Sequence, residues 1–539
     1  MPTRRALLLP TASALALGRP ALAQPGRTAD RGSVTATTHR GKVRGVVQDG
    51  IRVFKGVPYA APTDGPNRLR APRPAPAWPG VRDAFAFGPN CPQLPARALS
   101  LTASWSREAA MAEDCLTLNI WTPGLRDQRK RPVMVWFHSG GFQSGSASLS
   151  VYDGQRLARR GDVVVVTVNH RLNVFGHLYL AQLGGAEFAE SGNAGLLDLV
   201  AALRWINATI VEFGGDPANV TVFGQSGGGA KVSLLLGMPQ ARGLFHRAIV
   251  QSGSQLDVQT PEEATRNAAA LLAALDIKPQ EAARIRTFPV DRLLAAMTRV
   301  TTAPGARLGF GPVLDGVAIP RQPWAPDAPP TSVAVPLLVG TTATETTSLI
   351  GGDDAGVFSL PDADLGPRLR AWLPDRDVER VIAGYRRILP NASAADLFFA
   401  ITSARRARQP AWAQAERKAA QGGTPVWLYE LDWQTPVEGG KWRAPNGLDV
   451  PLVFDAVARS ESMVGTGREA QAMADHLAAT WIAFARTGQP HASREPAWPA
   501  FNPRERATML LDMRPRVVND HRGAERTLLA SLPPYRVVR

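Results

Sequence analysis

Cysteine is scarce in this sequence, which has only Cys91 and Cys115 among its 539 residues. Neither has a second cysteine or a histidine at the spacing of metal ligands, so we expect no metal site. Uninterrupted apolar runs are also lacking. None approaches the roughly 20 residues that cross a bilayer, and we expect no membrane span in the mature protein. No motif points to a cofactor, and we expect none.

Long basic runs are missing as well, although the formal net charge is +15. The arginines are scattered along the chain instead of forming the basic stripe that follows nucleic-acid phosphates. We therefore interpret the positive charge as a compositional preference for arginine, and we expect no nucleic-acid partner. The composition is otherwise that of an ordinary globular protein.

The first 23 residues have the pattern of an export signal. The pair Arg4-Arg5 precedes a mainly apolar stretch at 6–17, and the Ala-Leu-Ala of 21–23 provides a cleavage site before Gln24. The arginine pair is typical of the twin-arginine route, and the general secretory route is the alternative. Either route predicts a mature chain outside the cytoplasm, periplasmic or secreted.

An exported chain is delivered to a compartment in which disulfide bonds persist. The two cysteines permit one intramolecular bridge, between Cys91 and Cys115. Two unpaired, buried thiols are the alternative. We expect the bridge.

Strand-like and helix-like stretches alternate along the chain. Apolar runs typical of buried strands occur at 132–138, 163–168, 220–223, 248–251 and 335–340. Amphipathic stretches typical of helices occur at 195–210 and 261–275, among others. This alternation predicts a largely parallel sheet with helices on its faces. No internal repeat or low-complexity linker divides the chain, so residues 24–539 are expected to form a single domain.

The sequence Gly-Gln-Ser-Gly-Gly at 224–228 places Ser226 between a strand-like and a helix-like stretch. A serine on such a sharp turn exposes its hydroxyl above the sheet, at the positive end of the helix. Ser226 is therefore the candidate nucleophile. The backbone N–H groups of Gly140 and Gly141, which follow a buried strand, and that of Gly227 are the candidate oxyanion hole. Plain glycine turns are the alternative.

Two longer motifs resemble signatures of the type-B carboxylesterase family. The stretch 213–228 is similar to its serine signature, and Glu-Asp-Cys-Leu-Thr-Leu-Asn-Ile-Trp at 113–121 is similar to its cysteine signature. Further similarity at 54–60 and 483–488 extends the resemblance over nearly the whole mature chain. It implies the α/β-hydrolase fold, with a mostly parallel central sheet and helices on both faces, and a small-molecule carboxylic ester as substrate.

The glycine loop departs from the family in one place. Ser139 stands where the family usually has the first of three glycines, whereas Gly140 and Gly141 are retained. Because the retained glycines are the expected donors, we expect the oxyanion hole to be preserved.

The resemblance also implies a Ser, Glu, His triad. Glu345 matches the acid in the pattern Gly-Thr-x-x-x-Glu, although its spacing alone favours a solvated loop residue. The family pattern His-x-x-(Asp or Glu)-x-Pro-x-Val-Phe aligns with 446–454, where the first residue is Asn446. An amide has no basic nitrogen, so Asn446 cannot accept the proton of Ser226.

None of the eight histidines is a convincing replacement for this base. His138 ends a buried strand beside the glycine loop, and His476 lies on a predicted amphipathic helix at 467–486. A structural role is expected for both.

Two functional classes follow from this pattern. The first is a serine hydrolase that cleaves carboxylic esters through an acyl-enzyme, either slowly because of Asn446 or with an unrecognised base in place of the histidine. The second is a catalytically silent ester-binding or interaction protein that keeps the fold. We favour the first, since the candidate nucleophile, acid and oxyanion donors are all retained. The sequence specifies no oligomeric state.

Overall fold

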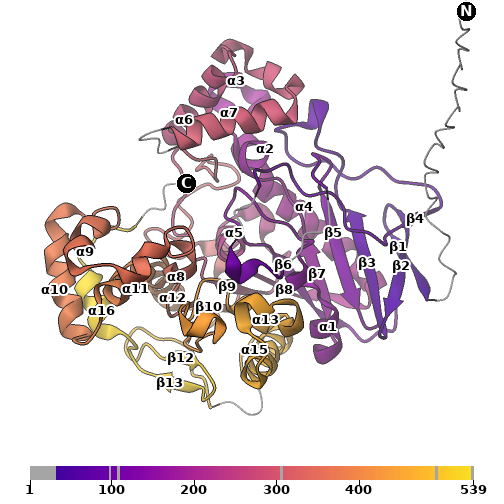
Figure 1. Cartoon of the computed structure of the whole chain (residues 1–539). Coiled ribbons are helices and arrows are strands. Elements are labelled where there is room, and N and C mark those ends of the chain that lie inside the picture. The colour runs from indigo at the N-terminus through magenta and orange to yellow at the C-terminus, as the bar shows by residue number, and fades with distance from the viewer. Residues whose placement is uncertain (1–31, 96–98, 106–109, 304–307, 492–495, 536–539) are drawn as a thin grey trace, which may run out of the picture.

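A 13-stranded sheet organises the protein (Figure 1). The computed structural model describes residues 32–95, 99–105, 110–303, 308–491 and 496–535. The predicted export signal, residues 1–23, lies outside the described residues. The strand order is β1-β2-β3-β5-β7-β6-β8-β9-β10-β11-β12-β13, and β4 pairs with β2.

The centre of the sheet is parallel. In sheet order, the strands from β7 to β12 run parallel to one another. The strands β1, β2, β3, β5 and β7 pair antiparallel in succession at one side of the sheet, and β13 pairs antiparallel with β12 at the other. The prediction of a mostly parallel sheet is confirmed. The strands are β1 (Ser33–Thr38), β2 (Gly41–Gln48), β3 (Ile51–Pro58), β4 (Val81–Asp83), β5 (Thr117–Thr122), β6 (Arg131–Phe137), β7 (Val164–Val168), β8 (Gly215–Gln225), β9 (Arg247–Gln251), β10 (Leu337–Thr342), β11 (Val426–Leu431), β12 (Thr508–Leu511) and β13 (Arg516–Val518).

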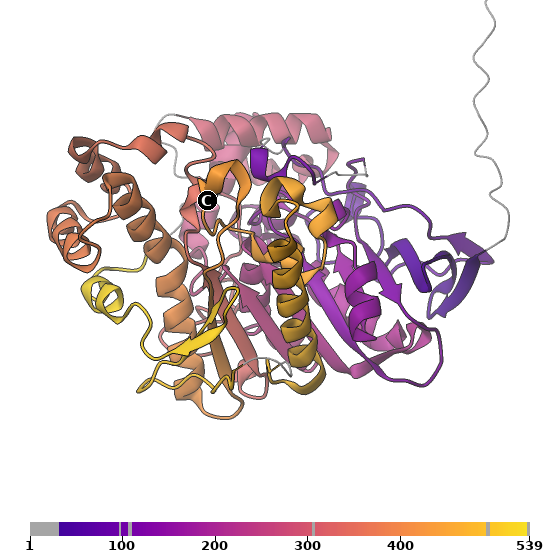
Figure 2. The same cartoon turned by 60° about the horizontal axis from the view of Figure 1, so that its bottom comes forward.

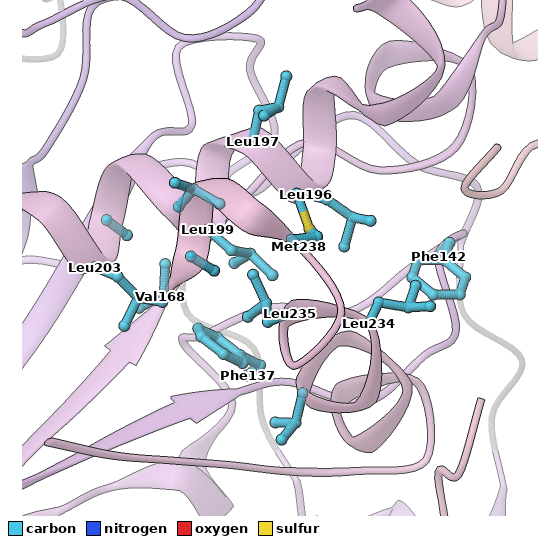
Figure 3. Packing of buried hydrophobic residues seen from close by; sticks show 14 of the residues in the cluster. Phe137, Phe142, Val168, Leu196, Leu197, Leu199, Leu203, Leu234, Leu235 and Met238 are labelled. Atoms are coloured by element: carbon cyan, nitrogen blue, oxygen red, sulfur yellow. The ribbon is translucent and has the colours of Figure 1, made fainter. Parts of the chain in front are cut away.

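Different helices bury the two faces of this sheet. Val135 and Phe137 of β6 belong to the apolar cluster that includes α4 and α5, and Figure 3 shows Phe137 beside Leu235 of α5. Met134 and Trp136, which alternate with them, belong to the cluster that includes α1, α13 and α15. The period of two residues is that of a strand buried on both sides. Helices on both faces were predicted and are confirmed.

Two further groups of helices lie outside this layered core (Figure 1). Helices α9, α10, α11 and α16 enclose an apolar cluster of their own, and α3, α6 and α7 gather at another side of the molecule. Figure 2 shows α15 lying across one face of the sheet. The helices are α1 (Gln155–Gly161), α2 (Asn173–His177), α3 (Ala181–Gly184), α4 (Ala194–Thr209), α5 (Gly227–Leu235), α6 (Pro261–Ala274), α7 (Val290–Thr302), α8 (Thr346–Leu349), α9 (Asp362–Leu369), α10 (Val378–Ile388), α11 (Ala394–Ser403), α12 (Gln409–Gln421), α13 (Asp449–Val453), α14 (Glu461–Val464), α15 (Arg468–Thr487) and α16 (Gly523–Leu529).

The predicted elements correspond to observed ones. The five predicted strands are β6 to β10, and the predicted helices at 195–210, 261–275 and 467–486 are α4, α6 and α15. Strand β8 begins earlier than predicted, at Gly215, because Gly215 pairs with Arg131 at the start of β6. The single domain stays a prediction, although the sheet takes strands from both ends of the described chain.

The segment Ala186–Phe213 is long and apolar enough, by composition alone, to cross a membrane. However, 72% of its most apolar window is buried inside the protein. The segment contains α4, which packs on the sheet, so its apolar residues are those of a core helix.

The disulfide predicted between Cys91 and Cys115 is not formed. Both residues are buried free thiols, and Cys91 Sγ accepts a hydrogen bond from the backbone N–H of Leu172 at 3.2 Å. A hydrogen bond with Cys91, together with burial, raises the pKa of the Cys115 thiol well above its ordinary value. Because the thiolate is the form that is oxidised, a raised pKa slows the oxidation of Cys115.

The register of the parallel strands brings four strand ends to one edge of the sheet. Phe137 of β6 lies opposite Gly224 of β8, and Gln251 of β9 lies opposite both Gln225 of β8 and Gly340 of β10. The loops that follow these strands carry the candidate site residues. In open α/β sheets this edge is where ligands bind.

Candidate active site

Ser226 occupies a strained turn between β8 and α5. Its backbone has φ 54° and ψ −119°, outside the regions that a serine ordinarily adopts. The backbone N–H of Ser226 donates to the carbonyl of Gln251 at 2.7 Å, which fixes the turn to β9. Strain of this kind persists only where the surrounding structure holds it in place. The predicted strand-to-helix elbow is therefore present.

The turn is packed so closely that its glycines cannot be replaced. A Cβ on Gly227 would lie 2.3 Å from the backbone nitrogen of Gly141, and one on Gly228 would lie 2.0 Å from the carbonyl oxygen of Phe137. The elbow and the glycine loop are thus in direct backbone contact. Gly140 and Gly141 adopt φ angles of 99° and 64°, in the region that favours glycine.

Three backbone donors gather at this contact. Within the described part of the chain, neither Gly140 nor Gly141 donates its N–H to a protein group. Gly227 is the first residue of α5, where the N–H groups have no intrahelical acceptor and the helix dipole is positive. This arrangement favours an anion beside the hydroxyl of Ser226.

Two side-chain interactions that we did not predict hold the glycine loop. The ammonium group of Lys231, a fully buried residue of α5, donates to the carbonyl oxygens of His138 at 3.1 Å and Gly141 at 2.7 Å. The hydroxyl of Ser139 donates to Gln225 Oε1 at 2.7 Å. Ser139, which departs from the family pattern, therefore ties the loop to the end of β8.

Glu345 follows β10 and is fully buried. Its Oε1 accepts a hydrogen bond from the backbone N–H of Thr342 at 2.9 Å, and its Oε2 accepts one from Asn446 Nδ2 at 2.5 Å. Burial raises the pKa of the Glu345 carboxyl, and hydrogen bonds from Ser252, Asn446 and Thr342 oppose this rise. The interpretation of Glu345 as a solvated loop residue is thereby excluded.

Asn446 lies on the loop before α13, 101 residues from Glu345 in sequence. Its amide nitrogen donates to the Glu345 carboxylate as the ring N–H of an imidazole would in a triad. Its backbone N–H also donates to the carbonyl of Glu345 at 3.4 Å. The two residues that the family motifs pair are thus hydrogen-bonded in the structure, and the group beside the Glu345 carboxylate is an amide.

Ser226, Glu345 and Asn446 line one cavity of about 670 Å³. This volume lies in the range of small-molecule binding pockets. No histidine is found among the described residues that line it.

Three histidines near the glycine loop have structural hydrogen bonds. His138 Nδ1 contacts the carbonyl of Ser139 at 2.8 Å, and its ring stacks on that of His170 at 4.8 Å. Burial lowers the pKa of His170 well below its ordinary value and that of His177 to about 3. The rings of His170 and His177 are therefore neutral. The contacts of His138 with Ser139 and His170 agree with the structural role predicted for it.

A sequence profile described as the carboxylesterase family matches residues 32–528. The chain belongs to the carboxylesterase family. It is 36% identical over 506 residues to para-nitrobenzyl esterase of Bacillus subtilis (strain 168), covering 92% of this chain and 98% of the relative. It is 34% identical to phenmedipham hydrolase of Pseudarthrobacter oxydans, covering 88% and 94%. The solved structure of carboxylesterase EST55 of Geobacillus stearothermophilus matches with a TM-score of 0.81 at 36% identity, over 92% of this chain and 99% of that one.

These similarities confirm the resemblance drawn from the sequence motifs and the α/β-hydrolase fold. Family membership assigns the chain to the carboxylic ester hydrolases.

One further acid lies behind the site of this carboxylesterase. Asp449, at the start of α13, is fully buried and accepts hydrogen bonds from Gln251 Nε2 at 2.7 Å and from the hydroxyl of Tyr429 at 3.3 Å. Burial raises the pKa of Asp449 to about 7, and the nearby Glu345 carboxyl contributes to the rise. The motif at 446–454 contains this residue, but its raised pKa follows only from its burial in the folded protein.

Proposed function

We propose that the chain cleaves carboxylic esters slowly, through an acyl-enzyme formed on Ser226. The observation that carries this proposal is the hydrogen bond between Asn446 Nδ2 and Glu345 Oε2 at 2.5 Å. It keeps the acid in its place and leaves the base position filled by a group that accepts no proton. The other parts of the machinery are assembled around the same cavity.

In this proposal the hydroxyl oxygen of Ser226 attacks the ester carbonyl carbon. The carbonyl oxygen becomes an oxyanion at the N–H groups of Gly140, Gly141 and Gly227. The C–O bond to the alcohol then breaks, the alcohol leaves, and water hydrolyses the acyl-serine to release the acid. With no imidazole to take the serine proton, that proton passes to water.

Losing the base of a serine triad removes up to about a millionfold in turnover, while the oxyanion hole and binding leave roughly a thousandfold over water. Slow but serine-dependent hydrolysis is the expected result.

A catalytically silent ester-binding protein is the second candidate. The feature that favours it is that Asn446 satisfies the buried Glu345 carboxylate, so the pocket persists without any base. Hydrolysis of an activated aryl ester, compared between the native chain and Ser226→Ala, separates the two candidates. A rate that falls on this substitution supports the hydrolase, and equal rates support the binding protein.

We also infer that the mature chain is exported, since residues 1–23 have the signal pattern described above. Sequencing of the N-terminus of the mature protein tests this inference. A chain that begins near Gln24 is expected, and one that still begins at Met1 contradicts it.

A further inference from the structure

The cavity that holds Ser226 and Glu345 is also lined by four arginines, the exposed Arg266 and the more buried Arg405, Arg406 and Arg417, and by the acidic residues Asp257 and Glu263. Arg405 and Arg417 have protein partners. Arg405 donates to Gln409 Oε1 at 2.7 Å and to the carbonyl of Pro533 at 2.8 Å, and Arg417 donates to the carbonyl of Trp324.

Arg406 differs from both. Arg406 is half-buried and lines the cavity. Within the described residues its guanidinium makes no hydrogen bond and no ion pair. Burial lowers the pKa of Arg406, and the Glu345 carboxylate opposes this shift. A guanidinium stays charged under such conditions.

Arg406 lies in an irregular segment of helix that lines the cavity. Residues Ala404–Arg408 form a π-helical turn between α11 and α12. Two residues further along the same turn, Arg408 is buried in the protein, where it donates to the carbonyl of Ala343 at 2.8 Å and to Glu525 at 3.1 Å. Single π-helical turns inside α-helices are frequent at functional sites.

The Glu345 carboxylate is not the partner of Arg406. Both of its oxygens are already bound, to Thr342 and to Asn446. The two charges influence each other, but they form no ion pair. A partly desolvated cation with five N–H donors and no acceptor is costly unless a ligand supplies one.

We propose that Arg406 binds a carboxylate carried by the ester itself, so that the cavity selects esters with a second, ionised carboxyl group. A planar guanidinium and a carboxylate pair through two parallel hydrogen bonds. The inference rests on the proposed function, because the ester group of the same molecule is placed at Ser226.

Binding to the Ser226→Ala chain tests the inference without turnover. The probes are monomethyl glutarate, which carries a carboxylate, and dimethyl glutarate, which is neutral and of similar size. Titration calorimetry is expected to show the monoester binding at least about tenfold tighter than the diester. Adding Arg406→Gln should abolish this preference, and adding Arg406→Lys should retain part of it. The preference should also weaken with ionic strength.

Arg376→Gln is the matched control, since Arg376 is 86% exposed and lies outside the cavity lining. It should leave the preference unchanged. Acetoxyacetate, which carries its carboxylate on the alcohol side, shows by comparison with monomethyl glutarate which side of the ester faces Arg406. Three results overturn the inference. The monoester and the diester bind with equal affinity, Arg406→Gln weakens the binding of both equally, or neither anionic ester binds measurably.

Turnover provides a separate measurement. In chains that also carry Asn446→His, Arg406→Gln should raise KM for 4-nitrophenyl hydrogen glutarate by roughly 10- to 100-fold and leave 4-nitrophenyl valerate unaffected. A loss of kcat for both substrates would show that Arg406 acts on Glu345 instead. A chain that hydrolyses neither ester contradicts the proposed function, and the calorimetric comparison still decides the inference.

Discussion

Replacing Asn446 with histidine should rebuild a complete triad. Asparagine and histidine both carry a side-chain nitrogen bonded to Cγ, so the imidazole Nδ1 can take the place of the amide Nδ2, which donates to Glu345 Oε2 at 2.5 Å. The opposite ring nitrogen, Nε2, then extends into the cavity that Ser226 lines. The cavity, at about 670 Å³, has room for the two additional heavy atoms of the imidazole.

The gain is bounded by the rate that a triad loses without its base. That loss reaches about a millionfold, or roughly 8 kcal/mol of transition-state stabilisation. Because the rebuilt base enters a site that has adapted to an amide, we expect a partial recovery, of at least about a hundredfold, equivalent to roughly 2.7 kcal/mol. The assay is hydrolysis of a 4-nitrophenyl ester followed by absorbance.

The pH dependence of the recovered rate identifies its source. An imidazole accepts the serine proton only when neutral, so the rate should rise with pH through the neutral region and level off above it. The buried Glu345 carboxylate moves this rise to higher pH, since it favours the imidazolium. A second substitution, Ser226→Ala, should abolish the gain. An Asn446→His chain that folds normally but hydrolyses no faster than the native chain would refute the reasoning.

Three further predictions follow from the geometry. At pH values between the ordinary pKa of an aspartate and about 7, Asp449 is protonated in the folded state and ionised in the unfolded state. The free energy of unfolding therefore falls by up to roughly 4 kcal/mol as pH rises through this range. Urea unfolding at pH 5 and pH 8 should therefore show a smaller pH dependence for Asp449→Asn than for the native chain, and equal dependences would contradict this. Gly227→Ala should lower the serine-dependent rate of the Asn446→His chain at least about tenfold, because its Cβ displaces the backbone of Gly141. Gly467→Ala is the control, since a Cβ there meets open space. An equal effect of both substitutions would count against the contact between Gly227 and Gly141. Lys231→Met should cost about 1–3 kcal/mol in unfolding free energy, since two buried carbonyls lose their donor, whereas the exposed Lys278→Met should be near neutral; similar costs would disprove the role of the ammonium group.

The sequence predicts the centre of this fold well because burial there is unambiguous. The strands at 132–138 and 163–168 are buried on both faces, and their continuous apolar runs have no other plausible structure. Ser226 was found for a related reason, since glycines on both sides of a serine between a strand and a helix indicate a tight turn. The pairing of Glu345 with Asn446 required the family motifs, because no local pattern connects residues so far apart in the chain.

The features that escaped prediction depend on tertiary contacts. Lys231 follows the elbow by one helical turn, and only the packing of α5 beneath the glycine loop makes it a buried donor. Arg406 lines the cavity from a π-helical turn, which has no sequence signature. The reduced state of Cys91 and Cys115 was missed because compartment and motif carry no information about the polarity around each thiol.

The bond between Asn446 and Glu345 has an evolutionary consequence. The buried Glu345 carboxylate would destabilise the fold if it lost the amide donor of Asn446, so replacements without an N–H donor at this position are costly. Asparagine supplies this donor, so Glu345 stays paired although the position holds no base. Every asparagine codon differs from a histidine codon in its first base alone. A histidine at this position therefore lies one point mutation away, and selection for faster ester cleavage in the laboratory should produce it here first.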